Sequence, residues 1–454
     1  MGAPLTVEDL RSLVDDGTID TVVIAFTDVQ GRLQGKRCHA TYFLDEVLSH
    51  AAEACNYLLA VDVEMNTIDG YDMTSWETGY GDFVLRPDLD SLRLLPWQPG
   101  TAQVICDLEW GDGSPVVASP RQVLRRQLDR LAERGLVAFA GTELEFIVFR
   151  DTYEQAWDAG YRNLAPVNQY NVDYSLQGTA RIEPLLRRIR NEMSDAGLVV
   201  ESAKGECNLG QHEIAFKYDE ALITADQHAV YKAGAKDIAA QEGMSLTFMA
   251  KYDQREGSSC HIHLSVRGTD GTPVMAGDGT GEAQGFSPLM EHWLAGQLAC
   301  LEELSLLYAP NVNSYKRFAE GSFAPTAVAW GRDNRTCAMR VVGAGLGLRV
   351  ENRVPGGDVN PYLALAAVIA AGLHGIDQEL ALGPELTGNA YASNGPRVPS
   401  TLRDAMAGFE RSTVARDAFG DDVVDHYLHA ARVEQAAFDA AVTDWERVRG
   451  FERL

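Results

Sequence analysis

The sequence lacks a long hydrophobic run. Its longest apolar stretch, residues 362–373, is too short to cross a bilayer. The first ten residues, MGAPLTVEDL, carry acids where a secretory signal would carry basic residues and an apolar stretch. The seven cysteines are scattered and never spaced as CxxC, which argues against a disulfide framework and a zinc ribbon. We therefore expect a cytoplasmic protein with free thiols and without a membrane partner.

Basic residues are also scarce. Lys and Arg total 39 against 65 Asp and Glu, which gives a formal charge of −26. This much negative charge repels a phosphate backbone at long range, so nucleic acid is excluded as an expected partner. A site for a phosphate-containing ligand would need local arginine, lysine or a divalent metal to overcome that field.

The length and the hydrophobic pattern predict more than one domain. The chain has 454 residues, of which 46% are hydrophobic and 23% are charged, as in ordinary globular proteins. Strand-like runs such as TVVIAFTDVQG, with a turn at residues 28–31, dominate the first hundred residues, and GDGSP has the composition of a linker. We predict a domain boundary near residue 115, with residues 1–114 and 115–454 as the two domains.

The second domain should mix helices and strands, so the expected fold class is α+β. A helix should begin at Pro120, after Ser119 as its N-cap, and end before Gly135. Further helical patterns cover residues 181–196, 222–242, 286–308, 361–381, 401–410 and 422–446. Strand-like runs cover residues 137–149, 244–253, 259–267, 336–342 and 347–354.

Three of these strands place ionisable or polar side chains at alternate positions, where one face of a strand collects them. The residues concerned are Glu143 and Glu145; His261, His263 and Ser265; and Arg349, Glu351 and Arg353. A single such strand is usually an edge strand with a solvated face. Three in one domain favour a shared site instead, because buried carboxylates need a cation.

A fourth segment, GECNLGQHE, adds Glu206 and Glu213, although alone it would be read as a polar loop. The pooled set is rich in oxygen ligands, which suits Mg²⁺ or Mn²⁺ better than structural zinc. Other motifs fail on inspection. HEIAF is not HExxH, GRLQGKR lacks the spacing of a phosphate-binding Walker A loop, and GAGLGL has no strand and helix around it that would indicate a dinucleotide site.

Arginines gather near these candidate ligands. The segments SYKRF, WGRDNRTCAMR and LRVENR supply Lys316, Arg317, Arg332, Arg335, Arg340, Arg349 and Arg353. They could be solvated or pair with the surplus acids. Together with divalent ions, however, they match the demands of phosphoryl transfer, in which charge on phosphate oxygens must be neutralised.

These motifs resemble the glutamine synthetase superfamily, in its bacterial dodecameric branch and its amine-using relatives. The resemblance extends over nearly the whole chain and rests on GTELEF, GECNLGQHE, SSCHIH, NVNSYKRF, DNRTCAMR and ENRVPGGDVNPYLA, in the family's order. It implies an N-terminal β-grasp domain and a catalytic domain whose curved antiparallel sheet is flanked by helices. It also implies a homo-oligomer, a dodecamer of two stacked hexameric rings, in which the neighbouring subunit's N-terminal domain closes each site.

The resemblance also implies roles for individual residues. Glu145, Glu206 and Glu213 would hold one metal ion, and Glu143, His261 and Glu351 a second. Arg317 and Gly257 would bind L-glutamate, Arg335 and Arg353 would stabilise the transferring phosphoryl group, and Arg340, Arg349, His263 and Ser265 would contact ATP. The implied reaction forms γ-glutamyl phosphate from glutamate and ATP, after which an amine displaces phosphate.

Departures from the family pattern indicate which kind of amine is the acceptor substrate. Ammonia-using members carry a glutamate where this chain has Phe323, and a DGSS segment for which it offers only residues 62–70. A further departure is Glu256, where the family usually has asparagine in the loop on the glutamate side. A phenyl ring loses the charge that selects ammonium and provides an apolar wall, so we predict a small primary amine as acceptor.

Ethanolamine is the first choice, because the chain looks most like actinobacterial members that glutamylate it. The alternatives are a γ-glutamylpolyamine or γ-glutamylputrescine synthetase and an ordinary ammonia-dependent glutamine synthetase. A catalytically silent structural relative and a metal-dependent amide hydrolase are further alternatives. Glu64, Asp62 or Glu320 would meet the amine or act as base, and the sequence does not choose among them. Tyr391 is interpreted as structural.

Overall fold

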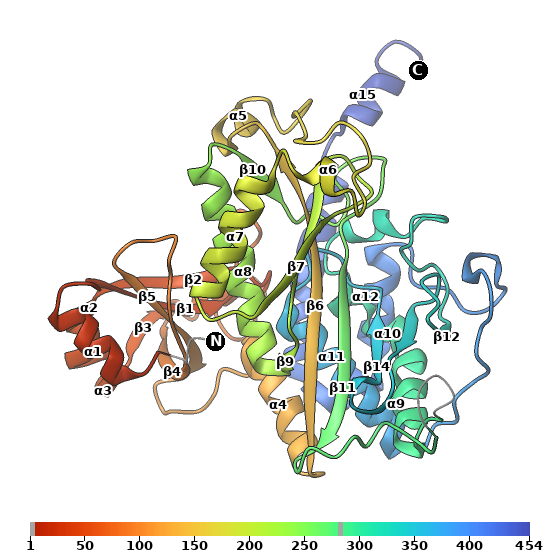
Figure 1. Cartoon of the computed structure of the whole chain (residues 1–454), viewed down its shortest axis with the longest axis horizontal. Coiled ribbons are helices and arrows are strands. Elements are labelled where there is room, and N and C mark those ends of the chain that lie inside the picture. The colour runs from red at the N-terminus through yellow and green to blue at the C-terminus, as the bar shows by residue number, and fades with distance from the viewer. Residues whose placement is uncertain (1–4, 280–284) are drawn as a thin grey trace.

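The computed structural model describes residues 5–279 and 285–454, so the first four residues of the segment that argued against a signal peptide lie outside the described residues. Figure 1 shows a small sheet with its helices beside a larger body, in which helices pack against a long-stranded sheet. In the described residues the strands form a five-stranded and a nine-stranded sheet. The mixed α and β content agrees with the expected fold class.

The small sheet is built by the N-terminal region in the strand order β2-β1-β5-β4-β3. Strands β1 and β5 are parallel and the other neighbours antiparallel. The strands are β1 (Thr21–Thr27), β2 (Leu33–His39), β3 (Ala52–Cys55), β4 (Asp82–Leu94) and β5 (Thr101–Glu109). The helical segments are α1 (Val7–Asp15), α2 (Ala40–Tyr42), η1 (Phe43–Val47), α3 (Leu48–His50) and η2 (Asn56–Leu59).

The two faces of this small sheet pack against different cores. Along β1, Val22, Ile24 and Phe26 enter a local core with the N-terminal helices, whereas Ala25 joins the core of the larger body. Asn360 donates hydrogen bonds from Nδ2 to the carbonyls of Asp28 (3.2 Å) and Val29 (3.1 Å), in the turn after β1. The two regions are therefore joined by shared packing, and the domain boundary near residue 115 stays a prediction.

The large sheet has the order β12-β13-β14-β11-β6-β8-β7, with β9 and β10 also pairing with β6. Its neighbours are antiparallel except for β12 and β13, which pair in parallel. Its strands are β6 (Leu136–Phe149), β7 (Val200–Gly205), β8 (Gln211–Phe216), β9 (Asp219–Glu220), β10 (Ser245–Thr247), β11 (Cys260–Gly268), β12 (Trp330–Arg332), β13 (Met339–Val342) and β14 (Arg349–Asn352). The 14-residue strand β6 lies at the centre and contacts four others.

Helices cover this sheet, and the apolar helix α11 lies at their centre. Its Gly372 has no space for a side chain, because a Cβ atom there would lie 2.3 Å from the Trp293 ring of α9. The helices are α4 (Pro120–Ala132), α5 (Tyr153–Asp158), α6 (Leu176–Thr179), α7 (Glu183–Asp195), α8 (Ala221–Gln241), α9 (Pro288–Ala299), α10 (Leu301–Tyr308), α11 (Pro361–Asp377), α12 (Leu402–Arg411), α13 (Thr413–Phe419), α14 (Asp421–Ala440) and α15 (Asp444–Gly450). The short 3₁₀ helices are η4 (Ser314–Arg317), η5 (Gly345–Gly347) and η6 (Ala390–Ala392).

Several predicted elements end differently in the structure. The helix expected over residues 286–308 divides at Cys300 into α9 and α10, and the run 422–446 ends at Ala440 before α15 begins. The strand expected over 244–253 is only Ser245–Thr247, because the chain then turns and the Ala250 carbonyl accepts a hydrogen bond from the Ser258 amide (3.0 Å). Ser119 occupies the N-cap of α4 as predicted, but its side chain makes no capping hydrogen bond.

Two sequence-based expectations concern chain-wide properties. None of the helices in the described part of the chain combines the length and the apolar composition that crossing a bilayer requires. All seven cysteines are free thiols, as expected.

Candidate active site

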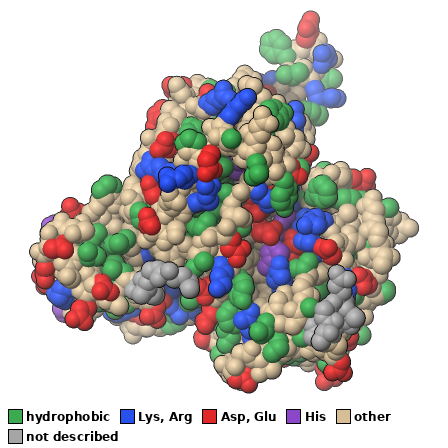
Figure 2. Space-filling view, viewed as in Figure 1, with side chains coloured by type: hydrophobic (Ala, Val, Ile, Leu, Met, Phe, Trp, Pro, Cys, Tyr) green, Lys and Arg blue, Asp and Glu red, His purple; other side chains and the backbone are tan. Residues whose placement is uncertain are grey.

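Strand β6 positions the first pair of candidate ligands. Its residues Leu144, Phe146 and Val148 are buried in the main core, as the alternation predicted. Glu143 and Glu145 therefore project from the opposite face of the sheet. Figure 2 shows acidic, basic and histidine side chains gathered in a hollow on this side of the molecule.

The first carboxylate cluster forms across β6, β8 and the end of β7. Glu145 lies opposite Glu213 in the β6–β8 register, and Glu206 follows β7. One carboxylate oxygen from each of these three residues lies within 4.8 Å of the others. Glu145 is held by the Ser259 amide (2.7 Å) and by the Gln211 side-chain amide (3.0 Å). The structure thus brings together the three residues predicted for the first metal ion.

The three carboxylates of this cluster carry more negative charge than the neighbouring basic side chain neutralises. The pKa of Glu213 is raised to about 8, chiefly by burial and also by the charges of Glu143 and Glu145, against the attraction of Lys204. Lys204 contacts Glu206 directly and lies 3.6 Å from Glu213. Three carboxylates with one amine leave a site whose charge and oxygen ligands fit a hard divalent cation.

The second cluster forms where β6, β11 and β14 run side by side. Glu143 lies opposite His261, and His263 lies opposite Glu351. The Glu143 carboxylate is 3.2 Å from His261 Nδ1 and 2.9 Å from His263 Nε2, while His261 Nδ1 is 3.5 Å from Glu351. Ligand atoms of Glu143, His263 and Glu351 also fall within 4.8 Å of one another. Both histidines are therefore within reach of a cation here, whereas the family resemblance implies His261 as a metal ligand and His263 as a nucleotide contact.

Two arginines converge on the buried Glu351. Arg340, on β13, donates to it from Nη1 (2.7 Å), and Arg353 forms a close ion pair with it. Burial acts to raise the pKa of Glu351, but His261, Arg353 and His263 outweigh burial, so the pKa is lowered and the carboxylate stays ionised. Arg335 is exposed on the turn before β13 and belongs to neither cluster.

A cavity of about 270 Å³ adjoins this second cluster. Three residues predicted to contact the nucleotide line it together with Glu143, namely His263, Ser265 and Arg349. Arg349 Nε lies 3.0 Å from His263 Nδ1.

Sequence reasoning missed much of this cavity. Its walls also include Phe139, Tyr218 and Arg267, with the Arg267 guanidinium 4.4 Å from the Phe139 ring centre and 5.3 Å from that of Tyr218. Phe139 and Arg267 continue the same alternate-residue faces as Glu143 and His263. Extending the alternation along β6 and β11 would have found them.

The residues predicted to bind glutamate are also adjacent. Arg317 is buried, and its Nη2 donates to the carbonyls of Arg353, Val354 and Pro355 at 2.6–3.0 Å. Its Nε and Nη1 atoms are buried without hydrogen-bond partners. A Cβ atom at Gly257 would lie 2.7 Å from Arg317 Cγ and 2.3 Å from the Ala250 carbonyl. Arg317 therefore has unused donors beside a glycine that permits close packing.

The acceptor-side residues lie on an open loop. Phe323 has a φ of +58° and is 55% exposed, and its carbonyl accepts from Arg353 Nη2 at 3.4 Å. Glu320 is exposed on the same loop. The Tyr391 hydroxyl donates to the Ala324 carbonyl (3.0 Å) from a buried position, which agrees with a structural role.

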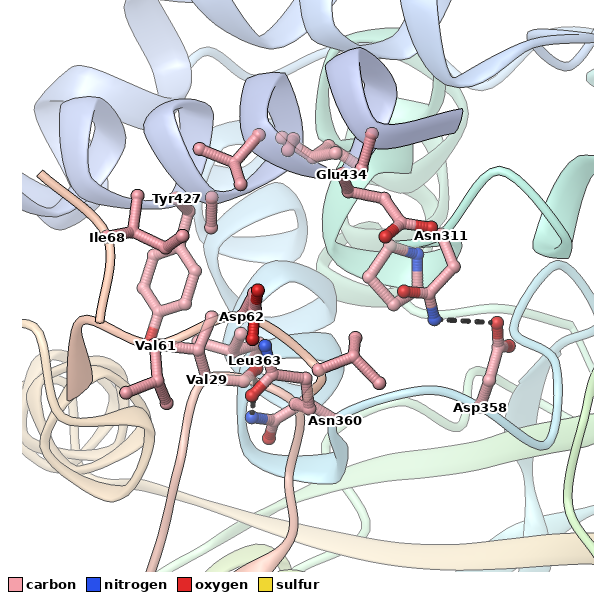
Figure 3. Close-up of a pocket in the computed structure, with 18 of the residues that line it drawn as sticks. Val29, Val61, Asp62, Ile68, Asn311, Asp358, Asn360, Leu363, Tyr427 and Glu434 are labelled. Carbon is pink, nitrogen blue, oxygen red and sulfur yellow. Dashed lines mark hydrogen bonds between the residues drawn. The ribbon is translucent and has the colours of Figure 1, made fainter. Parts of the chain in front are cut away.

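Glu64 lies elsewhere within this chain. Together with Asp62 it lines a separate cavity next to α14, shown in Figure 3, which shares no lining residue with the nucleotide-side cavity. The Asp62 carboxylate accepts a hydrogen bond from the Asn66 amide (2.8 Å). The structure thus does not bring these two acids to either carboxylate cluster of the same subunit.

Comparisons with known proteins agree with this geometry. Residues 117–449 match the glutamine synthetase catalytic domain. The chain is 68% identical to a γ-glutamylethanolamide synthetase, GlnA4, of Streptomyces coelicolor, over 99% of this chain and 96% of that protein. It is 37% identical to a glutamate–isopropylamine ligase of a Pseudomonas species, over 97% and 96%. A solved GmaS/ADP complex superposes with a TM-score of 0.86 at 28% identity, covering 98% of this chain and 99% of that one. The chain therefore belongs to the glutamine synthetase family.

Proposed function

We propose that the protein is an ATP-dependent ligase that joins the γ-carboxylate of L-glutamate to a small primary amine, with ethanolamine as first choice. The observation that carries this proposal is the 68% identity to a γ-glutamylethanolamide synthetase over 99% of the chain. The site supports it, since the predicted carboxylates lie in two clusters beside a cavity and a buried arginine with free donors.

In the first step, an oxygen of the glutamate γ-carboxylate attacks the γ-phosphorus of ATP, and the bond to ADP breaks. Arg317 would hold the α-carboxylate through Nε and Nη1, which otherwise lack partners. Arg340 and Arg353, with the more exposed Arg335, would stabilise charge on the transferring phosphoryl group.

Divalent ions, Mg²⁺ or Mn²⁺, would be held by the two clusters and neutralise phosphate oxygens. The set Glu145, Glu206 and Glu213 would hold one ion, and Glu143, His261 and Glu351 the other, with His263 close enough to share the second. ATP would occupy the adjoining cavity with its base between the aromatic and arginine side chains, where Ser265 and Arg349 add polar contacts.

In the second step, the nitrogen of the amine attacks the acyl carbon of γ-glutamyl phosphate. Phosphate leaves with its oxygen, and the nitrogen loses a proton to a base, for which Glu320 is our candidate. The Phe323 ring would contact the carbon chain of the amine. A phenyl ring offers no charge to select ammonium, which favours an organic acceptor.

We also propose that the protein works as a cytoplasmic homo-oligomer, a dodecamer of two hexameric rings. The free thiols agree with a reducing compartment. Two features support assembly. Asp62 and Glu64 lie away from the clusters of their own subunit, as expected if they contribute to a neighbour's site. Helix α15 and the residue that follows it also expose large apolar side chains, those of Trp445 (68%), Val448 (71%) and Phe451 (94%). Figure 1 shows α15 projecting from the body of the molecule.

The proposal is tested by measuring phosphate release from ATP with glutamate and a series of acceptors. Ethanolamine, putrescine, isopropylamine and ammonium are compared at equal concentration, and γ-glutamyl amides are identified by mass spectrometry. We expect turnover with ethanolamine well above that with ammonium. Efficient turnover with ammonium alone would contradict the amine specificity. Amine release from a γ-glutamyl amide without nucleotide would indicate a hydrolase.

A further inference from the structure

Residues 353–358, which follow β14, hold the arginine proposed to bind glutamate, and we call them the carbonyl segment. Arg317 Nη2 donates to the first three carbonyls of this segment at 2.6–3.0 Å. At the other end, Asp358 accepts from Ser314 Oγ (2.6 Å), which lies in the same short helix η4 as Arg317. Figure 3 shows a second hydrogen bond to Asp358, from Asn311 (2.9 Å). The orientation of Arg317 therefore depends on where the carbonyl segment lies.

The carbonyl segment packs closely against neighbouring backbone at Gly357. A Cβ atom there would lie 2.6 Å from the Phe248 carbonyl oxygen and 3.3 Å from that of Glu145. The Gly357 amide donates to the Ser258 carbonyl (3.0 Å). Glycine has more conformational freedom than other residues and offers no side chain that could fix it. The position of Gly357 is therefore set by hydrogen bonds with other parts of the chain.

Helix α8 supplies one of these hydrogen bonds through Lys232. Its Nζ donates to the Gly357 carbonyl at 2.8 Å and lies 5.6 Å from the centre of the Phe248 ring. The pKa of Lys232 is lowered to about 8, chiefly by burial and also by the charge of Lys236, against the attraction of groups that include Asp358. An ammonium group that gives up hydration is stabilised by the acceptors that it retains. The contact with Gly357 is therefore a specific one, unlike the chance contact of a solvated lysine.

We propose that Lys232 is a positioning residue for glutamate binding. By holding the Gly357 carbonyl, Lys232 fixes the carbonyl segment. The segment in turn orients Arg317 so that its free Nε and Nη1 donors meet the α-carboxylate of the substrate. Lys232 itself contacts no reactant, and this inference rests on the proposed function, in which Arg317 binds that carboxylate.

The effect of Lys232 should fall on glutamate rather than on ATP. The described residues that line the nucleotide-side cavity include none of the carbonyl segment. The guanidinium of Arg353, which is proposed to stabilise the phosphoryl group, has its own anchor in an ion pair with Glu351. Loss of the Lys232 contact should therefore raise the KM for glutamate and leave the KM for ATP and kcat nearly unchanged.

The test is steady-state kinetics of the full-length enzyme, with phosphate release measured at varied glutamate or ATP. Lys232→Met keeps an unbranched side chain without the donor, and Lys232→Gln is shorter and uncharged. We expect both variants to raise the KM for glutamate about tenfold, while the KM for ATP and kcat stay within about threefold of the wild type. Lys232→Arg, which keeps a charged donor, should recover most of the affinity. A misfolded fraction would lower kcat without changing KM, so the split does not report stability.

Lys236→Met is the matched control. Lys236 lies one turn further along α8, and its Nζ is 5.9 Å from the centre of the same Phe248 ring, so the change removes a similar charge. It should keep the wild-type KM for glutamate, because the hydrogen bond from α8 to Gly357 comes from Lys232. In an Arg317→Lys background, Lys232→Met should change that KM little further, as expected if Lys232 acts through Arg317.

The inference is overturned if Lys232→Met and Lys232→Gln both keep the wild-type KM for glutamate, or if Lys236→Met raises it equally. It is also overturned if the KM for ATP rises in parallel, or if Lys232→Met keeps its full effect in the Arg317→Lys background. A wild type without glutamate-dependent turnover would contradict the proposed function, and this inference with it.

Discussion

At the scale of single residues, Glu145 is the side chain on which the first cluster depends. It is buried, and its carboxylate accepts from the Ser259 amide and from Gln211, so its position is fixed before any ion binds. A buried, fixed carboxylate beside Glu206 and Glu213 is suited to hold a cation. Replacing it should therefore affect cation binding more than folding.

We expect Glu145→Gln to lower turnover with every amine by about 100-fold or more, because it removes a charged ligand while keeping the side-chain shape. Manganese binding, measured by electron paramagnetic resonance, should weaken in parallel, and the circular dichroism spectrum should not change. Glu133→Gln serves as the charge-matched control at an exposed position. Unaltered turnover in Glu145→Gln would remove Glu145 from the ligand set.

Gly257 limits the space around Arg317. A methyl group there would lie 2.3 Å from the Ala250 carbonyl and 2.7 Å from Arg317 Cγ, so the arginine would have to move. We expect Gly257→Ala to raise KM for glutamate about tenfold, since an overpacked contact typically costs about 1–3 kcal/mol. Gly111→Ala, where a Cβ atom would meet nothing within 4 Å, is the matched control. An unchanged KM would separate Gly257 from glutamate binding.

Phe323 determines the acceptor in our proposal. Phe323→Glu should gain turnover with ammonium and lose about tenfold or more with ethanolamine, because a charge replaces an apolar wall. Phe323→Leu keeps the wall apolar and should retain the preference for the organic amine. Competition between ammonium and ethanolamine, read from the two products by mass spectrometry, measures the change. If both variants keep the wild-type preference, the acceptor binds elsewhere.

At the scale of elements, helix α14 contains a buried histidine. His426 packs against the rings of Tyr71 and Tyr427, with centroids 4.6 Å and 5.3 Å away. Its pKa is lowered from 6.5 to about 4, chiefly by burial and also by the neighbouring His429, against a backbone hydrogen bond with Leu59. As pH falls below 6.5, the unfolded chain takes up a proton that the folded chain does not accept until about pH 4. Stability is therefore lost across this window.

The loss for one such group amounts to about 3 kcal/mol once the pH is below both values. We expect the Tm of the wild type to fall more steeply between pH 7 and pH 4.5 than that of His426→Gln, which cannot titrate. Differential scanning calorimetry at both pH values measures the difference in slope. His39→Gln, at an exposed histidine, should keep the wild-type slope. Equal slopes in the wild type and His426→Gln would show that His426 does not contribute.

The alternation within strands could be predicted from the sequence, but the pairing between strands could not. Glu143, Glu145, His261 and His263 occur at alternate positions, so each pair had to share a face. Glu145 lies opposite Glu213 because of the register in which β6 pairs with β8. This register depends on turns and core packing, which the local sequence does not specify. The family resemblance supplied this grouping, and the structure supplies the contacts.

Some structural features could not be predicted from the local pattern of hydrophobic and polar residues. The division of residues 286–308 at Cys300 interrupts a hydrophobic period that continues on both sides, so the pattern predicted one helix. The separation of Glu64 from both clusters depends on how the N-terminal region packs against α14, which no motif reports. Phe139 and Arg267 could have been predicted by following the strand faces further.

At the scale of the whole molecule, exposed apolar side chains near the C-terminus lead us to expect contacts between subunits. Phe451 and Leu454 are 94% and 103% exposed in the single chain, an unusual state for large apolar side chains. We expect Phe451→Ser combined with Leu454→Ser to shift the protein to smaller oligomers in sedimentation velocity experiments. Arg453→Ser, a polar change in the same tail, should leave the assembly intact. An unchanged sedimentation coefficient in the double variant would show that the tail is not an interface.

Strand β6 fixes the distance between Glu143 and Glu145. Glu143 and Glu145 are two residues apart on one extended backbone, so their Cα atoms are separated by about 6.6 Å, twice the rise of a strand. The spacing between the two candidate ligand groups is thus set by peptide geometry inside a packed core. Phe323, by contrast, lies on an exposed loop that contributes to neither group. Homologous enzymes could therefore acquire different acceptors through loop substitutions while the distance across which phosphate is transferred stays constant.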